Sequence, residues 1–158
     1  MAKVLIGFMG SGKSTLAKLL DPNFVDMDAL LTEKIGMPIA DFFATEGEPA
    51  FRTLESQLLE ELLATDCLVA TGGGVVTSPK NRALLAQNAC NIYLKADFDS
   101  LYQRIAADQA HQRPLFLTKT KAELRALFEE RIAWYEELAT QVVEVADRSP
   151  EEIREDIG

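Results

Sequence analysis

The feature that most constrains the chain is a glycine-rich stretch near its start, which reads Gly7-Phe8-Met9-Gly10-Ser11-Gly12-Lys13-Ser14. A short apolar run precedes it, and a helical pattern follows from Ser14. Strand, G-x-x-x-x-G-K-S turn and helix together are typical of a P-loop, in which backbone N–H groups and the positive end of the helix dipole face phosphate oxygens. Lys13 would reach the β- and γ-phosphates of a nucleotide, and the Ser14 hydroxyl would bind Mg²⁺. The residues predicted to form this nucleotide site are Gly10, Ser11, Gly12, Lys13, Ser14 and Thr15.

The composition narrows the class of partner. The chain has 158 residues, a net charge of −9 and a hydrophobic share of 47%, which suits one globular domain over residues 1–158. An acidic protein is a poor match for nucleic acid or an anionic membrane. Anionic small molecules must therefore be held by a few placed cations. No apolar segment is long enough to cross a bilayer or to act as a signal peptide, so we expect a cytoplasmic protein. Because no surplus apolar stripe is evident, we also expect a monomer.

Four further short apolar runs follow the P-loop, at 23–26, 66–70, 91–95 and 141–145. Helical patterns separate them, and this alternation predicts an α/β fold with a parallel sheet and helices on both faces. Capping and proline signals mark helix starts at Pro49, Pro79, Thr120 and Pro150. The polar connection at 108–119 is long for a compact domain and carries Arg113. We interpret it as a mobile lid that excludes water from a phosphoryl-transfer site.

Two carboxylates follow the second predicted strand. Asp26 and Asp28 are two residues apart, so in an extended chain both would point into the crevice above the sheet, where ligands of α/β proteins bind. One could hold Mg²⁺ or its waters, and the other could accept a proton from an attacking hydroxyl. They could equally be acids at the start of a helix, favoured by its dipole. The spacing alone leaves both interpretations open.

The remaining polar signals are a glycine triplet and two arginines. Gly72-Gly73-Gly74 follows the third predicted strand, and three consecutive glycines indicate backbone packed closely against something. A substrate lying on bare amides is one interpretation, and a tight turn without ligand is the other. Arg52 precedes Glu55 by three residues, the spacing of an ordinary surface pair. Taken singly, Arg52 and Arg131 are each typical of solvated charges. The residues alone thus predict a P-loop NTP-dependent enzyme or switch.

Taken together, these motifs resemble those of the shikimate kinases over nearly the whole chain. The segment GFMGSGKST is similar to that family's P-loop, FVDMDALL to its acidic pair and ATGGGVV to its glycine triplet. IADFFATEGEPAFRTLE resembles its substrate-binding segment, QRPLF its lid arginine motif and ERIAWYEELA its late helix. The resemblance implies a fold like the nucleoside monophosphate kinases. That fold is a three-layer sandwich with five parallel strands in the order 2-3-1-4-5, a substrate-binding segment at about 28–56 and a mobile lid at about 108–119.

The resemblance also implies a reaction, which is transfer of the γ-phosphoryl group of ATP to the 3-hydroxyl of shikimate in aromatic amino-acid biosynthesis. Asp28 would bind shikimate hydroxyls and be the candidate base. Asp26 would hold Mg²⁺ through water, with Ser14 as a direct ligand. The shikimate carboxylate would be held by Arg52, Gly73 and Arg131.

On the nucleotide side, the resemblance assigns a catalytic role to Lys13 and to Arg113, which would reach the phosphates from the lid. Arg104 and Pro150 would flank adenine. ATP, Mg²⁺ and shikimate are therefore the expected small-molecule partners.

Three other functions fit parts of the pattern. A relative acting on gluconate or another small sugar acid would share the P-loop, although Arg52, the glycine triplet and Arg131 together favour shikimate by resemblance. A nucleoside monophosphate kinase would need a base pocket for its acceptor, of which the sequence shows no sign. A nucleotide-dependent switch would keep the P-loop without transferring a phosphoryl group. The guanine motif N-K-x-D, expected late in one such class, is absent.

Overall fold

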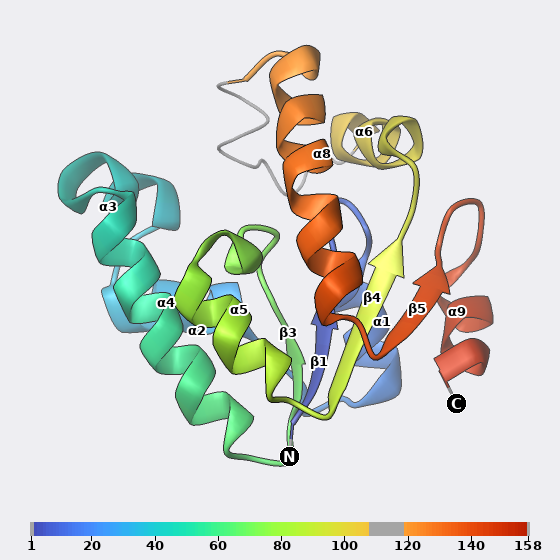
Figure 1. Ribbon diagram of the computed structural model, residues 1–158, viewed down its shortest axis with the longest axis horizontal. Helices are drawn as coiled ribbons and strands as arrows, with labels where there is room; N and C mark the ends of the chain where they lie inside the picture. Colours follow the sequence, from blue (N-terminus) through green and yellow to red (C-terminus); the bar gives the residue numbers. More distant parts are fainter. Residues whose placement is uncertain (1, 108–118, 158) are drawn as a thin grey trace.

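The fold is built on a five-stranded sheet in which all neighbouring strands are parallel, in the order β2-β3-β1-β4-β5 (Figure 1). It is described from a computed structural model, which covers residues 2–107 and 119–157. The predicted strand order is confirmed. The strands are β1 (Lys3–Ile6), β2 (Val25–Asp26), β3 (Leu68–Ala70), β4 (Cys90–Lys95) and β5 (Gln141–Glu144).

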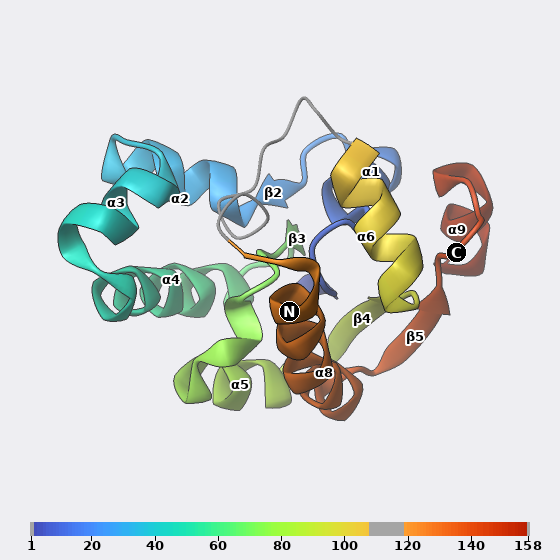
Figure 2. The same ribbon diagram turned by 90° about the horizontal axis from the view of Figure 1, so that it is seen from above.

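Helices cover both faces of the sheet, as the alternation of patterns predicts. Figures 1 and 2 show α4, α5 and α8 on one face and α1 and α9 on the other. The helices α2 and α3 pack against α4 beyond the β2 edge, and α6 lies above the carboxyl ends of the strands (Figure 1). The helices are α1 (Lys13–Leu20), α2 (Met27–Ile35), α3 (Ile39–Glu46), α4 (Glu48–Leu63), α5 (Pro79–Ala86), α6 (Phe98–Ala107), α8 (Lys121–Leu138) and α9 (Pro150–Ile157), with a 3₁₀ turn η1 (Val75–Thr77).

The central strand explains why the sheet is buried on both sides. Val4, Leu5 and Ile6 of β1 are fully buried, because a parallel strand covered by helices on both faces needs a continuous apolar run rather than an alternating one. β1 pairs with β3 on one side and with β4 on the other. The loop that follows β1 therefore emerges at the centre of the carboxyl edge of the sheet, where the other strand ends surround it.

Capping bonds confirm the helix starts predicted at Pro79, Thr120 and Pro150, whereas the helix predicted from Pro49 begins at Glu48 and has no side-chain cap. The Thr120 hydroxyl accepts the N–H of Glu123, and the Glu123 carboxylate accepts the N–H of Thr120, a reciprocal pair that fixes the start of α8. Ser78 accepts the N–H of Asn81 at the start of α5. Such caps each stabilise a helix by about 1 kcal/mol. The cap at Thr120 thus defines where α8, the helix that carries Arg131, begins.

Two predictions concern the rest of the chain. Arg113, and all of the predicted lid except its last residue, lie outside the described residues. Within the described ranges, each helix is too short or too polar to span a membrane.

Candidate active site

The P-loop folds as a nucleotide site requires, between β1 and α1. Gly10 has φ +83°, and a Cβ there would lie 2.9 Å from the Ile105 side chain and 3.1 Å from the Leu101 carbonyl oxygen. Conformation and space both demand glycine at this position. The loop opens onto a cavity of about 530 Å³, the P-loop cavity. Its lining includes Gly10, Gly12, Lys13, Ser14, Thr15, Asp26 and Asp28.

Lys13 lies inside the curve of the loop. Its Nζ donates to the carbonyls of Gly7 (2.5 Å) and Phe8 (3.2 Å), and the Oγ of the buried Ser11 is 3.5 Å away. The lysine charge is thus held beneath the backbone N–H groups that would face phosphate. The predicted phosphate-binding residues are brought together, with the Ser11 side chain beneath the loop.

Asp26 ends β2 and caps α2. Its Oδ1 accepts the N–H of Ala29 at 3.2 Å, and its Oδ2 accepts the Ser14 hydroxyl at 3.1 Å. A carboxylate and a hydroxyl side by side are hard oxygen donors of the kind that Mg²⁺ prefers, so these two residues fit a site for that ion. The two interpretations of Asp26, a helix-start acid and a metal ligand, are therefore compatible.

Asp28 reaches the crevice by a different route from the one predicted. The chain is not extended after Asp26, because α2 begins at Met27, and the argument from strand alternation is wrong. Asp28 instead projects from the first turn of α2 towards the glycine triplet, where a Cβ on Gly72 would lie 2.6 Å from Asp28 Oδ1. It lines the P-loop cavity and also a second cavity beside it.

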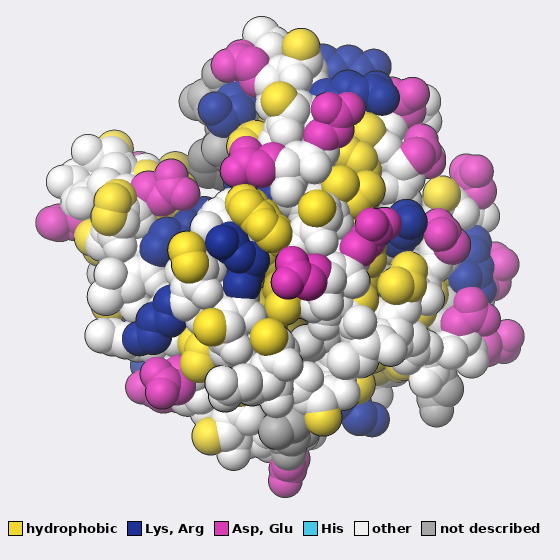
Figure 3. Space-filling model, viewed as in Figure 1, with side chains coloured by type: hydrophobic (Ala, Val, Ile, Leu, Met, Phe, Trp, Pro, Cys, Tyr) yellow, Lys and Arg dark blue, Asp and Glu magenta, His cyan; other side chains and the backbone are white. Residues whose placement is uncertain are grey.

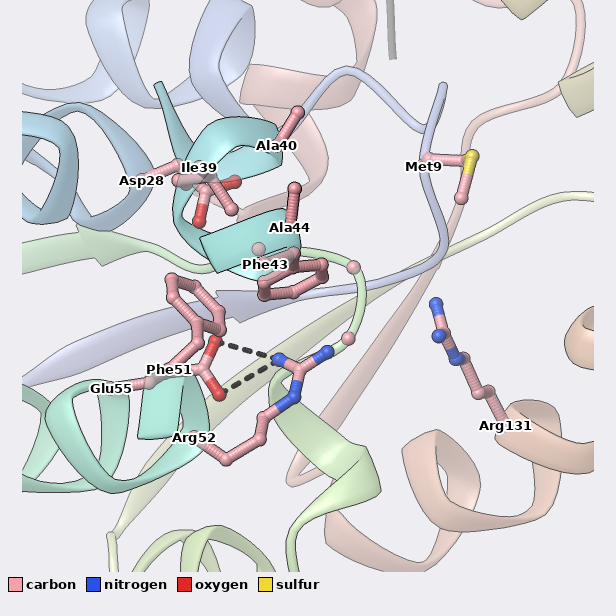
Figure 4. Close-up of a pocket in the computed structure, with 13 residues that line it drawn as sticks. Met9, Asp28, Ile39, Ala40, Phe43, Ala44, Phe51, Arg52, Glu55 and Arg131 are labelled. Atoms are coloured by element: carbon pink, nitrogen blue, oxygen red, sulfur yellow. Dashed lines mark hydrogen bonds and ion pairs between the residues drawn. The ribbon is translucent and has the colours of Figure 1, made fainter. Parts of the chain in front are cut away.

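The second cavity, here called the arginine cavity, has a volume of about 510 Å³. Arg52 enters it from α4 and Arg131 from α8 (Figure 4), and the glycine triplet also lines it. Met9, Asp28, Gly72 and Gly73 line both cavities, so the two meet at Asp28. The remaining lining residues of the arginine cavity are Ile39, Ala40, Phe43, Ala44, Phe51, Glu55 and Gly74.

Arg52 is held in place by a buried carboxylate. Its Nη1 lies 2.9 Å from Glu55 Oε1 and 3.1 Å from Oε2 (Figure 4), and Glu55 is only 1% exposed. The pair suggested by the spacing is therefore confirmed, but its placement at the surface is wrong. Burial raises the pKa of the Glu55 carboxyl, and the Arg52 charge acts in the opposite direction. The buried Asn81 also donates to Glu55 Oε1, at 3.0 Å.

Arg131 is buried as well, but it has no recorded carboxylate partner among residues 2–107 and 119–157. It is 4% exposed, and among the described residues no acceptor lies within hydrogen-bond range of its Nε or Nη1. Burial lowers the pKa of this guanidinium, and the Arg52 charge lowers it further. The interpretation of Arg131 as a solvated surface charge is wrong. A buried cation with orphaned donors, facing a cavity, is suited to an anionic ligand.

The glycine triplet touches a different part of the site at each residue. A Cβ on Gly72 would meet Asp28, one on Gly73 would lie 3.2 Å from the Met9 nitrogen, and one on Gly74 would lie 2.5 Å from Arg52 Nη2. Of the two interpretations of the triplet, the close-packed one is correct. The bare backbone lets the carboxylate, the P-loop and the guanidinium approach one another.

The two residues implied beside adenine lie on the far side of the P-loop. Arg104 Nη2 donates to the Val145 carbonyl at 2.8 Å, and its Nη1 lies 3.5 Å from the Gly10 carbonyl. Pro150 begins α9 a few residues after Val145. Arg104 thus links the P-loop to the segment that leads to Pro150.

Some residues of the site were missed from the sequence. Glu55 lies on the buried face of α4 with Phe51, Leu58 and Leu62, and a charge at a core-facing helical position was the available signal. Phe43 and Phe51 form walls of the arginine cavity, whereas aromatic residues at these positions are more often core.

Comparison with known proteins agrees with this geometry. The sequence profile of the shikimate kinase family matches residues 9–158. The chain belongs to the shikimate kinase family. Curated shikimate kinases from Streptococcus gordonii and Lactococcus lactis subsp. cremoris (strain MG1363) are 54% and 46% identical to it, over 98% and 99% of this chain and 97% and 96% of theirs. As a member of this family, the protein is an ATP-dependent kinase.

Solved structures give the same family. A shikimate kinase from Acinetobacter baumannii, determined in complex with shikimate, is 35% identical with a TM-score of 0.88, covering 99% of this chain and 89% of that one. A gluconokinase from Sinorhizobium meliloti has a TM-score of 0.59 at 19% identity, covering 98% of this chain and 87% of that one. That second likeness extends to the fold alone.

Proposed function

We propose that the chain transfers the γ-phosphoryl group of ATP to the 3-hydroxyl of shikimate, with ATP in the P-loop cavity and shikimate in the arginine cavity. The observation that carries the proposal is the buried Arg131, whose Nε and Nη1 lack acceptors among the described residues. A small carboxylic acid would supply them, and the planar guanidinium matches a carboxylate with two parallel hydrogen bonds. Arg52, already fixed by Glu55, would hold the same carboxylate together with the backbone of Gly73, which also lines the cavity.

Asp28 is the proposed base because it stands where the two cavities meet. An acceptor whose carboxylate lies against the arginines would have its hydroxyls near Asp28 and the transferring phosphoryl group beyond. Asp28 would orient the 3-hydroxyl and accept its proton as the new P–O bond forms. Because phosphoryl transfer depends mainly on positioning and charge neutralisation, an arrangement with few catalytic groups is sufficient.

The nucleotide side is proposed as follows. Lys13 would exchange the carbonyls of Gly7 and Phe8 for β- and γ-phosphate oxygens. Ser14 and Asp26 would hold Mg²⁺, Ser14 directly and Asp26 through water. When bound, the ion neutralises charge on the β- and γ-phosphates. The roles of Arg113 at the phosphates and of Arg104 and Pro150 at adenine are proposed from the resemblance.

The proposal includes a cytoplasmic monomer acting on small molecules. On the face formed by α4, α5 and α8, acidic and basic side chains are interspersed and apolar side chains are scattered among them (Figure 3). Scattered apolar residues are normal for the surface of a monomer.

The test is ADP release by the purified protein, measured in a coupled assay with and without shikimate. We expect ADP formation that saturates with shikimate, and little with gluconate or a nucleoside monophosphate. Release that ignores shikimate but responds to another acid would overturn the choice of substrate.

Replacing Arg52 tests whether the acceptor binds in the arginine cavity. Arg52→Ala should raise the KM for shikimate more than the KM for ATP, because the guanidinium lines only the arginine cavity of the two. Arg125→Ala is a matched control, since that side chain is 57% exposed on α8, forms an ion pair with Glu129 at 3.3 Å and lies 5.6 Å from the centre of the Phe98 ring, outside both cavities. If Arg52→Ala changed the KM for shikimate and the KM for ATP equally, Arg52 would have a structural role and no specific role in binding shikimate.

A further inference from the structure

The carbonyl oxygens of the glycine triplet are all anchored. Gly72 O accepts the N–H of Val75 at 3.2 Å, and Gly74 O accepts the N–H of Thr77 at 3.1 Å. Both bonds come from the turn that follows the triplet. Gly73 O is anchored differently, because it accepts a hydrogen bond from the Tyr135 hydroxyl of α8, which lies 62 residues further along the chain.

Tyr135 is buried and makes several specific contacts, one of them an electrostatic interaction with Arg131. It is 1% exposed, its ring stacks on that of Tyr93 with centroids 5.3 Å apart, and it lies one helical turn after Arg131 on the same face of α8. Burial raises the pKa of its hydroxyl well above the ordinary value. The hydroxyl therefore stays protonated and remains a donor to Gly73 throughout the working range of pH.

The bond constrains the amides that line the arginine cavity. A peptide unit is planar and trans, so an anchored Gly73 C=O also fixes the direction of the Gly74 N–H. Within the described part of the chain, the N–H groups of Gly73 and Gly74 donate to no acceptor. Here the carbonyl groups are hydrogen-bonded and the N–H groups between them make no recorded bond. Such a row of N–H groups forms a concave site suited to an anion.

We propose that Tyr135 is a positioning residue for the acceptor carboxylate: its hydroxyl holds the Gly73–Gly74 peptide so that the triplet's free amides face the anion held by Arg131. This inference rests on the proposed function. One helix would then place both the cation and, through Tyr135, the backbone donors. The competing explanation is that the hydroxyl merely finds a partner for a buried tyrosine, in which case it would affect stability and no single substrate.

The chain offers a matched pair of variants. Tyr135→Phe removes one oxygen and keeps the packed ring, and Tyr93→Phe makes the same change in the ring stacked on it, where the recorded bond to Gly73 is not involved. Thermal unfolding and circular dichroism establish that both are folded before assay. For Tyr135→Phe we expect the KM for shikimate to rise about tenfold, which corresponds to about 1.4 kcal/mol, the size of one hydrogen bond. The KM for ATP should stay within about twofold, and Tyr93→Phe should change neither value by more than that.

A second acceptor molecule distinguishes a specific role of Tyr135 in positioning the backbone donors from a general loss of rigidity in the site. The primary amide of shikimate replaces the carboxylate by a neutral group, so its binding should depend little on the oriented donors. The ratio of kcat/KM between wild type and Tyr135→Phe should be about ten for shikimate and near one for the amide. Equal ratios for both acceptors, an unchanged KM for shikimate, or an equal effect of Tyr93→Phe would overturn the inference. Failure of wild type to use shikimate would instead overturn the proposed function.

Discussion

Arg131 should lower the stability of the ligand-free protein while being needed for substrate binding, and Arg131→Met tests both effects. Methionine fills much of the arginine volume without a charge or a donor. Leaving a buried donor unsatisfied costs about 1–3 kcal/mol, and Arg131 has two such nitrogens among the described residues. The opposing contribution is its position over the Phe8 ring, at 5.8 Å, which is worth about 0.5–1 kcal/mol.

The balance favours the variant when no ligand is present. The two nitrogens together cost about 2–6 kcal/mol, so after subtracting the ring contact we predict a gain of about 1–5 kcal/mol in the free energy of unfolding, which for a chain of this size raises Tm by about 2–20 °C. Affinity for shikimate should fall in the same variant, since removing one partner of a buried charge pair costs about 2–5 kcal/mol, or roughly 30- to 4,000-fold. Thermal melts without ligand and a shikimate titration of the ATPase assay measure the two effects.

The control is Arg125→Met on the same helix, where the exposed arginine should change Tm by no more than about 2 °C. A fall in the ligand-free Tm of Arg131→Met by several degrees would refute the reasoning, because it would mean that the guanidinium is satisfied without substrate. If the affinity of Arg131→Met for shikimate were unchanged, the prediction that Arg131 binds this substrate would be refuted.

Three further variants test other parts of the site. Asp28→Asn should fold normally and lose about 10²–10⁴ in kcat if Asp28 is the base, whereas a loss under about tenfold would leave it a binding residue only. Gly74→Ala places a Cβ 2.5 Å from Arg52 Nη2 and should raise the KM for shikimate about tenfold with an unchanged KM for ATP; an unaffected KM would show that Arg52 can move freely. Burial raises the pKa of Glu55 above its ordinary value of 4.5, so just above pH 4.5 the folded state binds more protons than the unfolded chain and stability falls as pH rises. Urea unfolding of wild type and Glu55→Gln should show this fall in their difference, and a difference that grows with pH would contradict it.

The fold was predictable because its signals are local and repeated. Apolar runs separated by helical patterns indicate a parallel sheet, and the caps at Ser78 and Thr120 mark where helices start. The order of the strands came from the resemblance, since a run of apolar residues does not specify its neighbours. The error after Asp26 has a local cause. Asp26 is the last residue of β2, and its side chain also caps α2. The chain therefore becomes helical at the next residue, Met27.

The site was only half predictable for a different reason. Arg131 lies on the face of α8 that also carries Leu124, Phe128, Tyr135 and Leu138, and a charge among core-facing positions is a readable sign of function. Its partners are not readable, because they come from distant parts of the chain. The bond from Tyr135 to Gly73 spans 62 residues, and tertiary packing alone decides such pairs.

The charges of the arginine cavity argue for the kind of acceptor it would take. Among its described lining residues, the charged ones are Asp28, Arg52, Glu55 and Arg131. Arg52 and Glu55 largely cancel across their 2.9 Å contact, and Asp28 lies where the arginine cavity meets the P-loop cavity. Of the two arginines, Arg131 is the one with no recorded carboxylate partner among the described residues, so the net charge offered to a ligand suits a monoanionic carboxylate better than the dianionic phosphate of a nucleotide acceptor. In a chain with a net charge of −9, a buried guanidinium such as that of Arg131 would provide this selectivity without a general positive field.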